Sequence, residues 1–150
     1  DIVRDTITEI GIAPDTISLE ITESIAISNP DRAVRIMRQL RDLGVRISLD
    51  DFGTGYSSLG HLHRYPFDTL KLDRSFVAEM GGERGKIGRG IVRAVLDLAA
   101  TMELKVIAEG LETPNQRSDL RAMGCAYGQG YFYSRPVDRI AAGMLIARDR

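Results

Sequence analysis

Five strand-like segments alternate with helical segments along the chain, and this alternation restricts the fold more than any other feature of the sequence. Each strand-like segment is a short run of apolar and β-branched residues bounded by glycine, proline or polar residues. The predicted strands span residues 17–21, 45–50, 69–73, 105–109 and 127–133. Strands joined through helices are typical of parallel sheets with right-handed crossovers, so the predicted fold class is α/β.

Capping residues set the ends of several predicted helices. Asn29 followed by Pro30 predicts a helix start, and Gly44 predicts its end. The run from Thr113 to Gln116 has the pattern of a capping box. Five glycines between residues 80 and 90 predict a flexible connection. Helices are predicted over residues 2–10, 30–43, 57–62, 91–102, 113–123 and 140–146.

Composition excludes some classes of protein. A chain of 150 residues with 43% hydrophobic residues fits one globular domain. The formal net charge of -1 predicts no binding of DNA or RNA through charge alone. No apolar run approaches the roughly 20 residues of a membrane span. The single cysteine, Cys125, cannot form an internal disulfide, which fits a reducing compartment. We therefore expect a cytoplasmic location. A longer parent protein could still be anchored in a membrane by other segments.

Acidic side chains lie close to the carboxyl ends of the predicted strands. Taken singly, each would be interpreted as a surface or ion-paired residue. Taken together they need a counter-charge, and an all-oxygen set suits Mg²⁺, Mn²⁺ or Ca²⁺ better than zinc. In a barrel these strand ends converge on one axis, so we favour a barrel over an open sheet. The residues are Glu20, Asp50, Asp51, Asp73 and Glu109, with Lys71 on the same face as Asp73.

Two further segments could contact an anionic ligand. The turn Gly53-Thr54-Gly55 could present backbone N–H groups to a phosphate, although two glycines are a weak signal. Arg135 could meet a phosphate or a base, although an exposed arginine has no need of a ligand.

Several short motifs cover almost the whole chain. They are Leu19-Glu20-Ile21-Thr22-Glu23-Ser24, residues 50–59, Leu70-Lys71-Leu72-Asp73, residues 106–113, Gln129-Gly130-Tyr131 and Ser134-Arg135-Pro136. In these motifs and in their order, the chain resembles the C-terminal part of an EAL-domain cyclic di-GMP phosphodiesterase.

This resemblance implies a TIM-like barrel, present as about five β/α units, with residues 1–150 as the C-terminal part of one EAL domain. It implies hydrolysis of cyclic di-GMP to linear pGpG at a two-metal site holding Mg²⁺ or Mn²⁺. By position, the resemblance implies that Glu20 and Asp50 are metal ligands and that Asp51 and Asp73 bind the second metal. It also implies that Lys71 holds the catalytic water and that Glu109 is the general base. Supporting roles fall to Gln129, to Glu112, to Glu23, which steadies the loop after Asp51, and to the Gly53-Thr54-Gly55 turn as a lid.

The chain also departs from the family. It contains no Glu-Ala-Leu triplet, and a barrel of this kind takes about 250 residues. Five strands would leave two unpaired edges, so we expect the chain alone to be weakly stable, inactive, or paired as a homodimer.

Two alternatives to phosphodiesterase activity stay open. One is a noncatalytic cyclic di-GMP receptor or interaction module. The other is a metal-dependent barrel enzyme that abstracts a proton next to a carboxylate, with Lys71 as its base.

Overall fold

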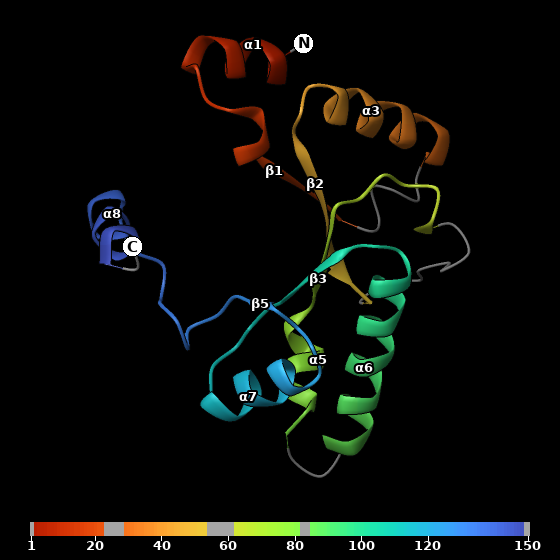
Figure 1. The fold of residues 1–150 in the computed structure, drawn as a ribbon, viewed down its shortest axis with the longest axis vertical. Helices are drawn as coiled ribbons and strands as arrows, with labels where there is room; N and C mark the ends of the chain where they lie inside the picture. The colour runs from red at the N-terminus through yellow and green to blue at the C-terminus, as the bar shows by residue number, and fades with distance from the viewer. Residues whose placement is uncertain (1, 23–28, 54–61, 82–84, 149–150) are drawn as a thin grey trace.

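A five-stranded parallel sheet forms the centre of the molecule in the computed structural model, which describes residues 2–22, 29–53, 62–81 and 85–148 (Figure 1). The strands lie side by side in the order in which they occur along the chain, and all neighbours are parallel. This is the arrangement that repeated β/α crossovers produce, so the predicted α/β class is confirmed. The strands are β1 (Ser18–Thr22), β2 (Arg46–Phe52), β3 (Thr69–Leu72), β4 (Lys105–Ala108) and β5 (Tyr127–Gly128).

Helices connect the strands and flank the sheet. They are α1 (Ile2–Ile10), a 3-10 turn (Pro14–Thr16), α3 (Pro30–Asp42), α5 (Arg74–Glu79), α6 (Gly85–Thr101), α7 (Pro114–Ala122) and α8 (Arg139–Arg148). The sequence did not predict α5, and most of the predicted helix over residues 57–62 lies outside the described residues. None of the described helices has both the length and the apolar character that crossing a bilayer requires.

Two predicted helix starts are confirmed. The Asn29 side chain accepts a hydrogen bond from the backbone N–H of Arg32 at 3.2 Å, which caps α3. At α7, Thr113 accepts from the Gln116 N–H at 3.3 Å while the Gln116 side chain accepts from the Thr113 N–H at 2.9 Å. These reciprocal bonds satisfy N–H groups that a helix start otherwise leaves unpaired.

The hydrophobic core lies between the sheet and its helices. Strand β3 is buried along its whole length, with Leu70 and Leu72 fully enclosed. Met37 of α3 and Val92 of α6 are also fully buried, and these helices contact β2 and β4 respectively. Because the core surrounds β3, any polar side chain on this strand is held in a rigid and largely dry setting.

Glycines in the first turns of α6 allow close packing against α5. The sequence had instead predicted a flexible connection here. Gly85 and Gly88 are buried inside the helix. A Cβ atom at Gly88 would lie 2.4 Å from the carbonyl oxygen of Glu79. The missing side chain therefore lets α6 approach the backbone at the end of α5, and residues 85–90 of the predicted connection are helical.

Strand β5 is shorter than predicted. It was expected to span residues 127–133, but it pairs with β4 only through Tyr127 and Gly128. The chain then turns back over Leu111, whose backbone accepts from the Phe132 N–H at 2.8 Å and donates to Gln129 O at 3.0 Å. The sequence pattern was wrong here because its apolar residues belong to a turn that packs on a neighbouring loop.

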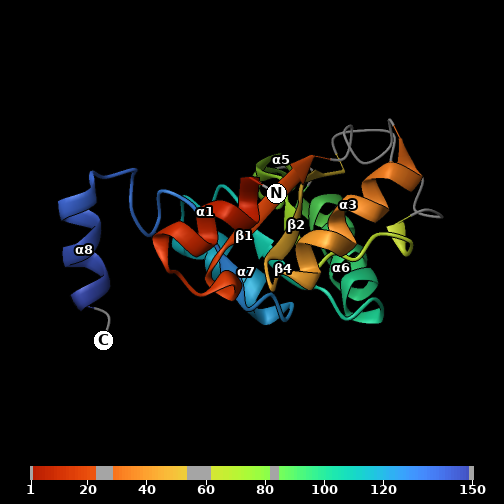
Figure 2. The same cartoon turned by 90° about the horizontal axis from the view of Figure 1, so that it is seen from above.

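Within the described part of the chain, β1 and β5 each have a neighbour on one side only. Helix α8 stands apart from the other elements in both Figure 1 and Figure 2, and its apolar side chains are exposed. Helix α1 likewise has no buried residue.

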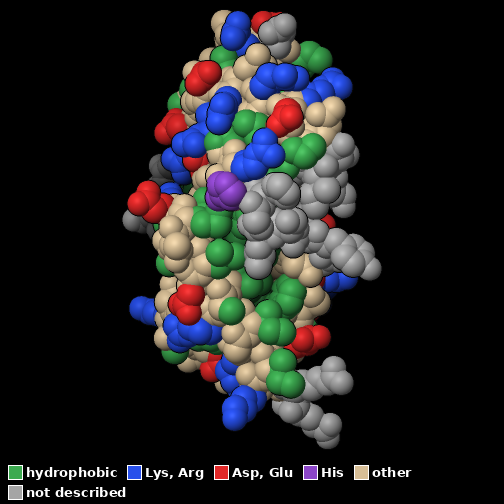
Figure 3. Space-filling model, turned by 90° about the vertical axis from the view of Figure 1, so that its right-hand side faces the viewer, with side chains coloured by type: hydrophobic (Ala, Val, Ile, Leu, Met, Phe, Trp, Pro, Cys, Tyr) green, Lys and Arg blue, Asp and Glu red, His purple; other side chains and the backbone are tan. Residues whose placement is uncertain are grey.

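On the face in Figure 3, basic and acidic side chains are interspersed around apolar patches, with no large field of one sign.

Candidate active site

A β-bulge places the two adjacent carboxylates at the end of β2. Leu49 pairs with Leu70 and Phe52 pairs with Leu72, so Asp50 and Asp51 together lie opposite Lys71. Asp51 adopts a left-handed φ of 53°, which is uncommon for a residue other than glycine. In a regular strand, successive side chains point to opposite faces; the extra residue re-aims one of them. The bulge thus lets both aspartates serve one site.

Lys71 is the centre of the site. Its side chain is 7% exposed, and its Nζ atom lies 2.8 Å from a Glu20 oxygen, 2.9 Å from Asp50 Oδ1 and 2.8 Å from Glu109 Oε1. These carboxylates come from β1, from β2 and from the residue after β4. The structure therefore brings together four of the predicted site residues at the carboxyl ends of four strands.

The surroundings of Lys71 keep it protonated. Burial by itself lowers the pKa of a lysine, but the carboxylates of Glu109, Glu20 and Asp50 outweigh this effect and raise the pKa of Lys71 above its ordinary value. A general base must be unprotonated before it accepts a proton. The raised pKa therefore argues against the alternative in which Lys71 is the base.

A group of acidic oxygens lies beside the lysine. Asp50, Asp51 and Glu109 each offer a carboxylate oxygen within 4.8 Å of the other two. Asp50 Oδ1 is buried, and no described donor makes an aligned hydrogen bond to it, although the Lys71 ammonium is close enough for an ion pair. A buried oxygen that lacks such a bond is suited to a cation. The oxygen donors fit a hard divalent ion.

The two other predicted metal ligands, Glu20 and Asp73, are not among these three residues. Glu20 contacts Lys71, yet half of its side chain is exposed. Asp73 caps α5: its Oδ1 atom accepts from the Ser75 backbone N–H at 3.0 Å and from the Ser75 hydroxyl at 2.5 Å. These hydrogen bonds lower the pKa of Asp73 against the opposing effect of burial.

The remaining predicted residues make no described ion pair with Lys71, or they lie outside the described part of the chain. Gln129 and Glu112 are exposed. The Gln129 N–H donates to the Ala108 carbonyl at 2.8 Å, and the Glu112 N–H donates to the Gln116 side-chain oxygen at 2.9 Å. Arg135 is also exposed, and its guanidinium lies 4.7 Å over the ring of Tyr131. Gly53 has a φ of 93° and packs against Phe76. Glu23, Thr54 and Gly55 lie outside the described residues.

Sequence reasoning missed the part of the site that α5 forms. Arg74 and Phe76 contact the turns that follow Glu109 and Asp51. The missed signal was Asp73 followed two residues later by Ser75, a pattern typical of a helix cap. From the sequence, Asp73 was interpreted as a metal ligand or as an ion-pair partner of Lys71, and not as a helix cap.

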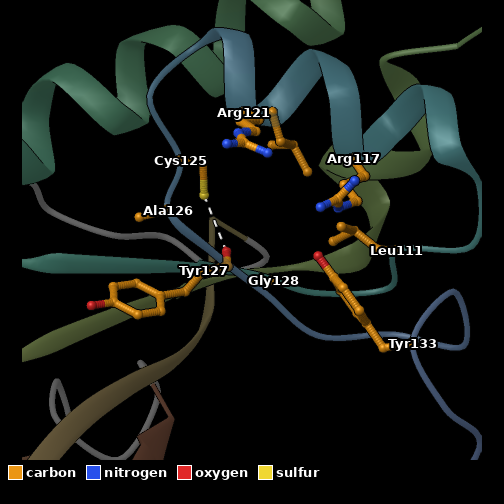
Figure 4. Close-up of a pocket in the computed structure, with 9 residues that line it drawn as sticks. Leu111, Arg117, Arg121, Cys125, Ala126, Tyr127, Gly128 and Tyr133 are labelled. Atoms are coloured by element: carbon orange, nitrogen blue, oxygen red, sulfur yellow. Dashed lines mark hydrogen bonds between the residues drawn. The ribbon is translucent and has the colours of Figure 1, made fainter. Parts of the chain in front are cut away.

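A separate pocket of about 350 Å³ lies between α7 and β5 (Figure 4). Arg117, Arg121 and Tyr133 line it, together with the buried Cys125. The Cys125 thiol donates to the carbonyl of Tyr127 at 3.3 Å, shown as the dashed line. None of the predicted catalytic or metal-binding residues borders this pocket, so it is distinct from the carboxylate cluster.

These features together define a class of protein. Parallel strands in sequential order, with charged groups gathered at their carboxyl ends, are typical of β/α-barrel proteins, whose ligands bind at that end.

Comparisons with known proteins agree with this class. The EAL domain family matches residues 1–136. The chain is 43% identical over 137 residues to the cyclic di-GMP phosphodiesterase NbdA of Pseudomonas aeruginosa; the match covers 91% of this chain and 17% of NbdA.

Solved structures have the same fold. The crystal structure of the EAL domain of Mycobacterium smegmatis DcpA is similar with a TM-score of 0.91 and 40% identity, over 99% of this chain and 66% of that chain. A complex of Klebsiella pneumoniae BlrP1 with manganese and cy-diGMP is similar with a TM-score of 0.80 and 32% identity, over 89% of this chain and 34% of that chain.

The chain belongs to the EAL domain family. It spans less than a fifth of the length of NbdA and about two thirds of the DcpA domain structure. Its five β/α units are an incomplete TIM-like barrel, so the predicted fold class and family are both confirmed.

Proposed function

We propose that residues 1–150 are the C-terminal part of a single EAL domain, and that the complete domain hydrolyses cyclic di-GMP to linear pGpG. The observation that carries this proposal is the buried Lys71 ammonium within 2.9 Å of three carboxylates at the strand ends. The similarity to NbdA, a cyclic di-GMP phosphodiesterase, supports the choice of substrate.

We assign the acidic side chains of the site as ligands of two Mg²⁺ or Mn²⁺ ions. Glu20 and Asp50 would hold one ion, and Asp51 and Asp73 would hold the second. The closeness of the Asp50, Asp51 and Glu109 oxygens supports this, as does the manganese in the BlrP1 complex. When bound, divalent ions would stabilise negative charge on the attacking and leaving oxygens of the phosphodiester.

Glu109 and Lys71 would act on the attacking water. Glu109 takes a proton from the water, whose oxygen forms a new bond to phosphorus while the bond from phosphorus to one ribose 3′ oxygen breaks. That oxygen takes a proton from solvent water as it leaves, and the product is the linear dinucleotide. Lys71 contacts Glu109 through Oε1, which leaves the second carboxylate oxygen to accept. One of the three ammonium N–H groups would turn from Asp50 Oδ1, to which no described donor makes an aligned hydrogen bond, and would orient the water.

Residues toward β5 would contact the rest of the substrate. Gln129 and Arg135 follow β5, and the guanidinium stacked over Tyr131 offers both a positive charge and a flat surface for a nucleotide. Glu23 is assigned to steadying the loop after Asp51, in which Gly53, Thr54 and Gly55 form the lid. Glu112, which lies between β4 and α7, is assigned a supporting role.

The test is product formation by the complete EAL domain that contains this chain. After treatment with EDTA, we expect no pGpG, and we expect turnover to return with Mn²⁺ or Mg²⁺. Absence of turnover with either ion would contradict the proposal; binding of cyclic di-GMP without turnover would instead favour the receptor. We place the activity in the cytoplasm, which the free, buried Cys125 supports.

A further inference from the structure

Helix α5 begins directly after the strand that carries Lys71. Asp73, two residues after the lysine, caps the helix through both the N–H and the hydroxyl of Ser75. Within α5, Val77 is fully buried, and Met80, which directly follows the helix, is 1% exposed. The helix is therefore fixed at both ends, so its first turn is a firm surface for whatever packs on it.

One side of this turn packs on the end of β2. A Cβ atom at Gly53 would lie 2.6 Å from Cζ of Phe76, closer than real Cβ atoms come to a neighbour. Gly53 also has a φ of 93°, a conformation that favours glycine. Since Gly53 comes two residues after Asp51, the Phe76 ring limits where the backbone of Asp51 can lie.

The other side packs on the turn after β4. A Cβ atom at Gly110 would lie 2.4 Å from the Cβ of Arg74. Gly110 has a φ of 70° and directly follows Glu109. The Glu109 N–H donates to the Leu72 carbonyl at 3.0 Å, which ties the same turn to β3. Contact with Arg74 therefore limits the position of Glu109.

We propose that the first turn of α5 is a positioning element for the carboxylate cluster, in which Phe76 and Arg74 hold Asp51 and Glu109 close enough to share a cation. The inference rests on the proposed function, because the cluster it serves is the one assigned to catalysis. Neither Phe76 nor Arg74 is assigned a contact with substrate. They act through the two glycine turns.

Alanine substitution at Gly53 and at Gly110 tests this proposal, and two other glycines of the chain with similar φ values serve as controls. Gly53 and Gly124 have φ values of 93° and 90°, and Gly110 and Gly11 both have 70°. A Cβ atom would meet nothing within 4 Å at Gly124 or at Gly11. Each control substitution therefore places a side chain at nearly the same φ as the matching test substitution, but it adds no contact with α5.

The readout is Mn²⁺ affinity of the complete domain, measured by calorimetry on folded protein. We expect Gly53→Ala and Gly110→Ala to weaken Mn²⁺ binding about 10-fold, as loss of a residue that orients ligands does. Gly124→Ala and Gly11→Ala should leave the affinity unchanged. In turnover, the first pair should lower kcat more than they raise KM. Equal Mn²⁺ affinity in test and control variants would overturn the proposal.

A double substitution separates positioning from simple destabilisation. Phe76→Leu removes the ring atoms that a Cβ at Gly53 would meet, namely Cζ and one Cε. We expect Phe76→Leu to restore part of the Mn²⁺ affinity lost in Gly53→Ala, whereas Phe132→Leu should restore none. Additive losses in the Phe76 double variant would overturn the proposal.

The two hypotheses fail in different ways. A wild-type domain that binds Mn²⁺ without hydrolysing cyclic di-GMP would contradict the proposed function and leave the affinity comparison intact. A wild-type domain that binds no Mn²⁺ would overturn both.

Discussion

At the scale of single residues, Lys71 supplies the charge that lets three carboxylates lie together. Its ammonium is buried, and it contacts Glu20, Asp50 and Glu109. Removing one partner from a buried ion pair leaves uncompensated charge in a poorly solvated place. The stability of this strand end therefore depends on the lysine.

Lys71→Met keeps the length of the side chain and removes the charge. In EDTA, we expect the free energy of unfolding of the complete domain to fall by about 3 kcal/mol, since the carboxylates lose their counter-charge. Urea denaturation measures this. Lys105→Met is the control, because Lys105 is exposed on β4; equal losses in the two variants would contradict the account of Lys71.

Cys125 allows a prediction about pH. Burial raises the pKa of its thiol above its ordinary value, even though hydrogen bonds with the backbone oppose this. A raised pKa means less thiolate at any given pH, and thiolate is the form that reacts. At pH 8, iodoacetamide should therefore label Cys125 far more slowly in the folded complete domain than in the same domain unfolded in urea. Mass spectrometry of the peptide that contains Cys125 measures the two rates; similar rates would contradict its burial.

At the scale of elements, α5 and α6 pack closely because glycine lies at their contact. A side chain at Gly88 would meet the backbone at Glu79, whereas one at Gly90, on the same helix, would meet nothing within 4 Å. The two glycines thus have opposite consequences within one turn of α6.

Alanine substitution should separate them. We expect Gly88→Ala to lower the free energy of unfolding by about 2 kcal/mol, because α6 must move away from α5. Gly90→Ala should raise it by about 0.5 kcal/mol, since alanine favours helix more than glycine does. Denaturation of both variants tests the pair; a loss at both positions would show that this segment does not form the described helix.

Elements that depend on local chemistry could be predicted from the sequence. The caps at Asn29 and Thr113 are set by residues within one turn, and both predictions are confirmed. The glycines at the start of α6 were predicted to form a flexible connection. That prediction was wrong because their close packing depends on the neighbouring helix α5. The end of β5 was misplaced for the same reason: the chain turns where it meets Leu111.

The candidate site shows the same limit. Alternation along the strands predicted that Glu20, Asp50, Lys71 and Glu109 would converge, and the structure brings them together. The bulge at Asp50 and Asp51 could not be predicted, because it is a property of the register between β2 and β3. The contacts of α5 with two glycine turns likewise exist only in three dimensions.

At the scale of the whole molecule, the sheet has two open edges among the described residues. Strands β1 and β5 each have unpaired backbone groups on one side, and apolar side chains on α1 and α8 are exposed. Unpaired edges and apolar patches favour association.

We therefore expect the 150-residue chain alone to self-associate, including as a homodimer, and to unfold without a sharp transition. Sedimentation velocity and thermal unfolding measure these properties. A monomer that melts cooperatively would contradict this expectation.

The central claim is that the carboxylates around Lys71 perform phosphodiester hydrolysis, and Glu109→Gln in the complete domain tests it most directly. The amide keeps the size of the side chain and cannot act as the base, so we expect pGpG formation with Mn²⁺ to fall by about 10³-fold. Binding of cyclic di-GMP should persist in calorimetry, which would show that the site is intact. A variant that hydrolyses cyclic di-GMP at nearly the wild-type rate would contradict the account.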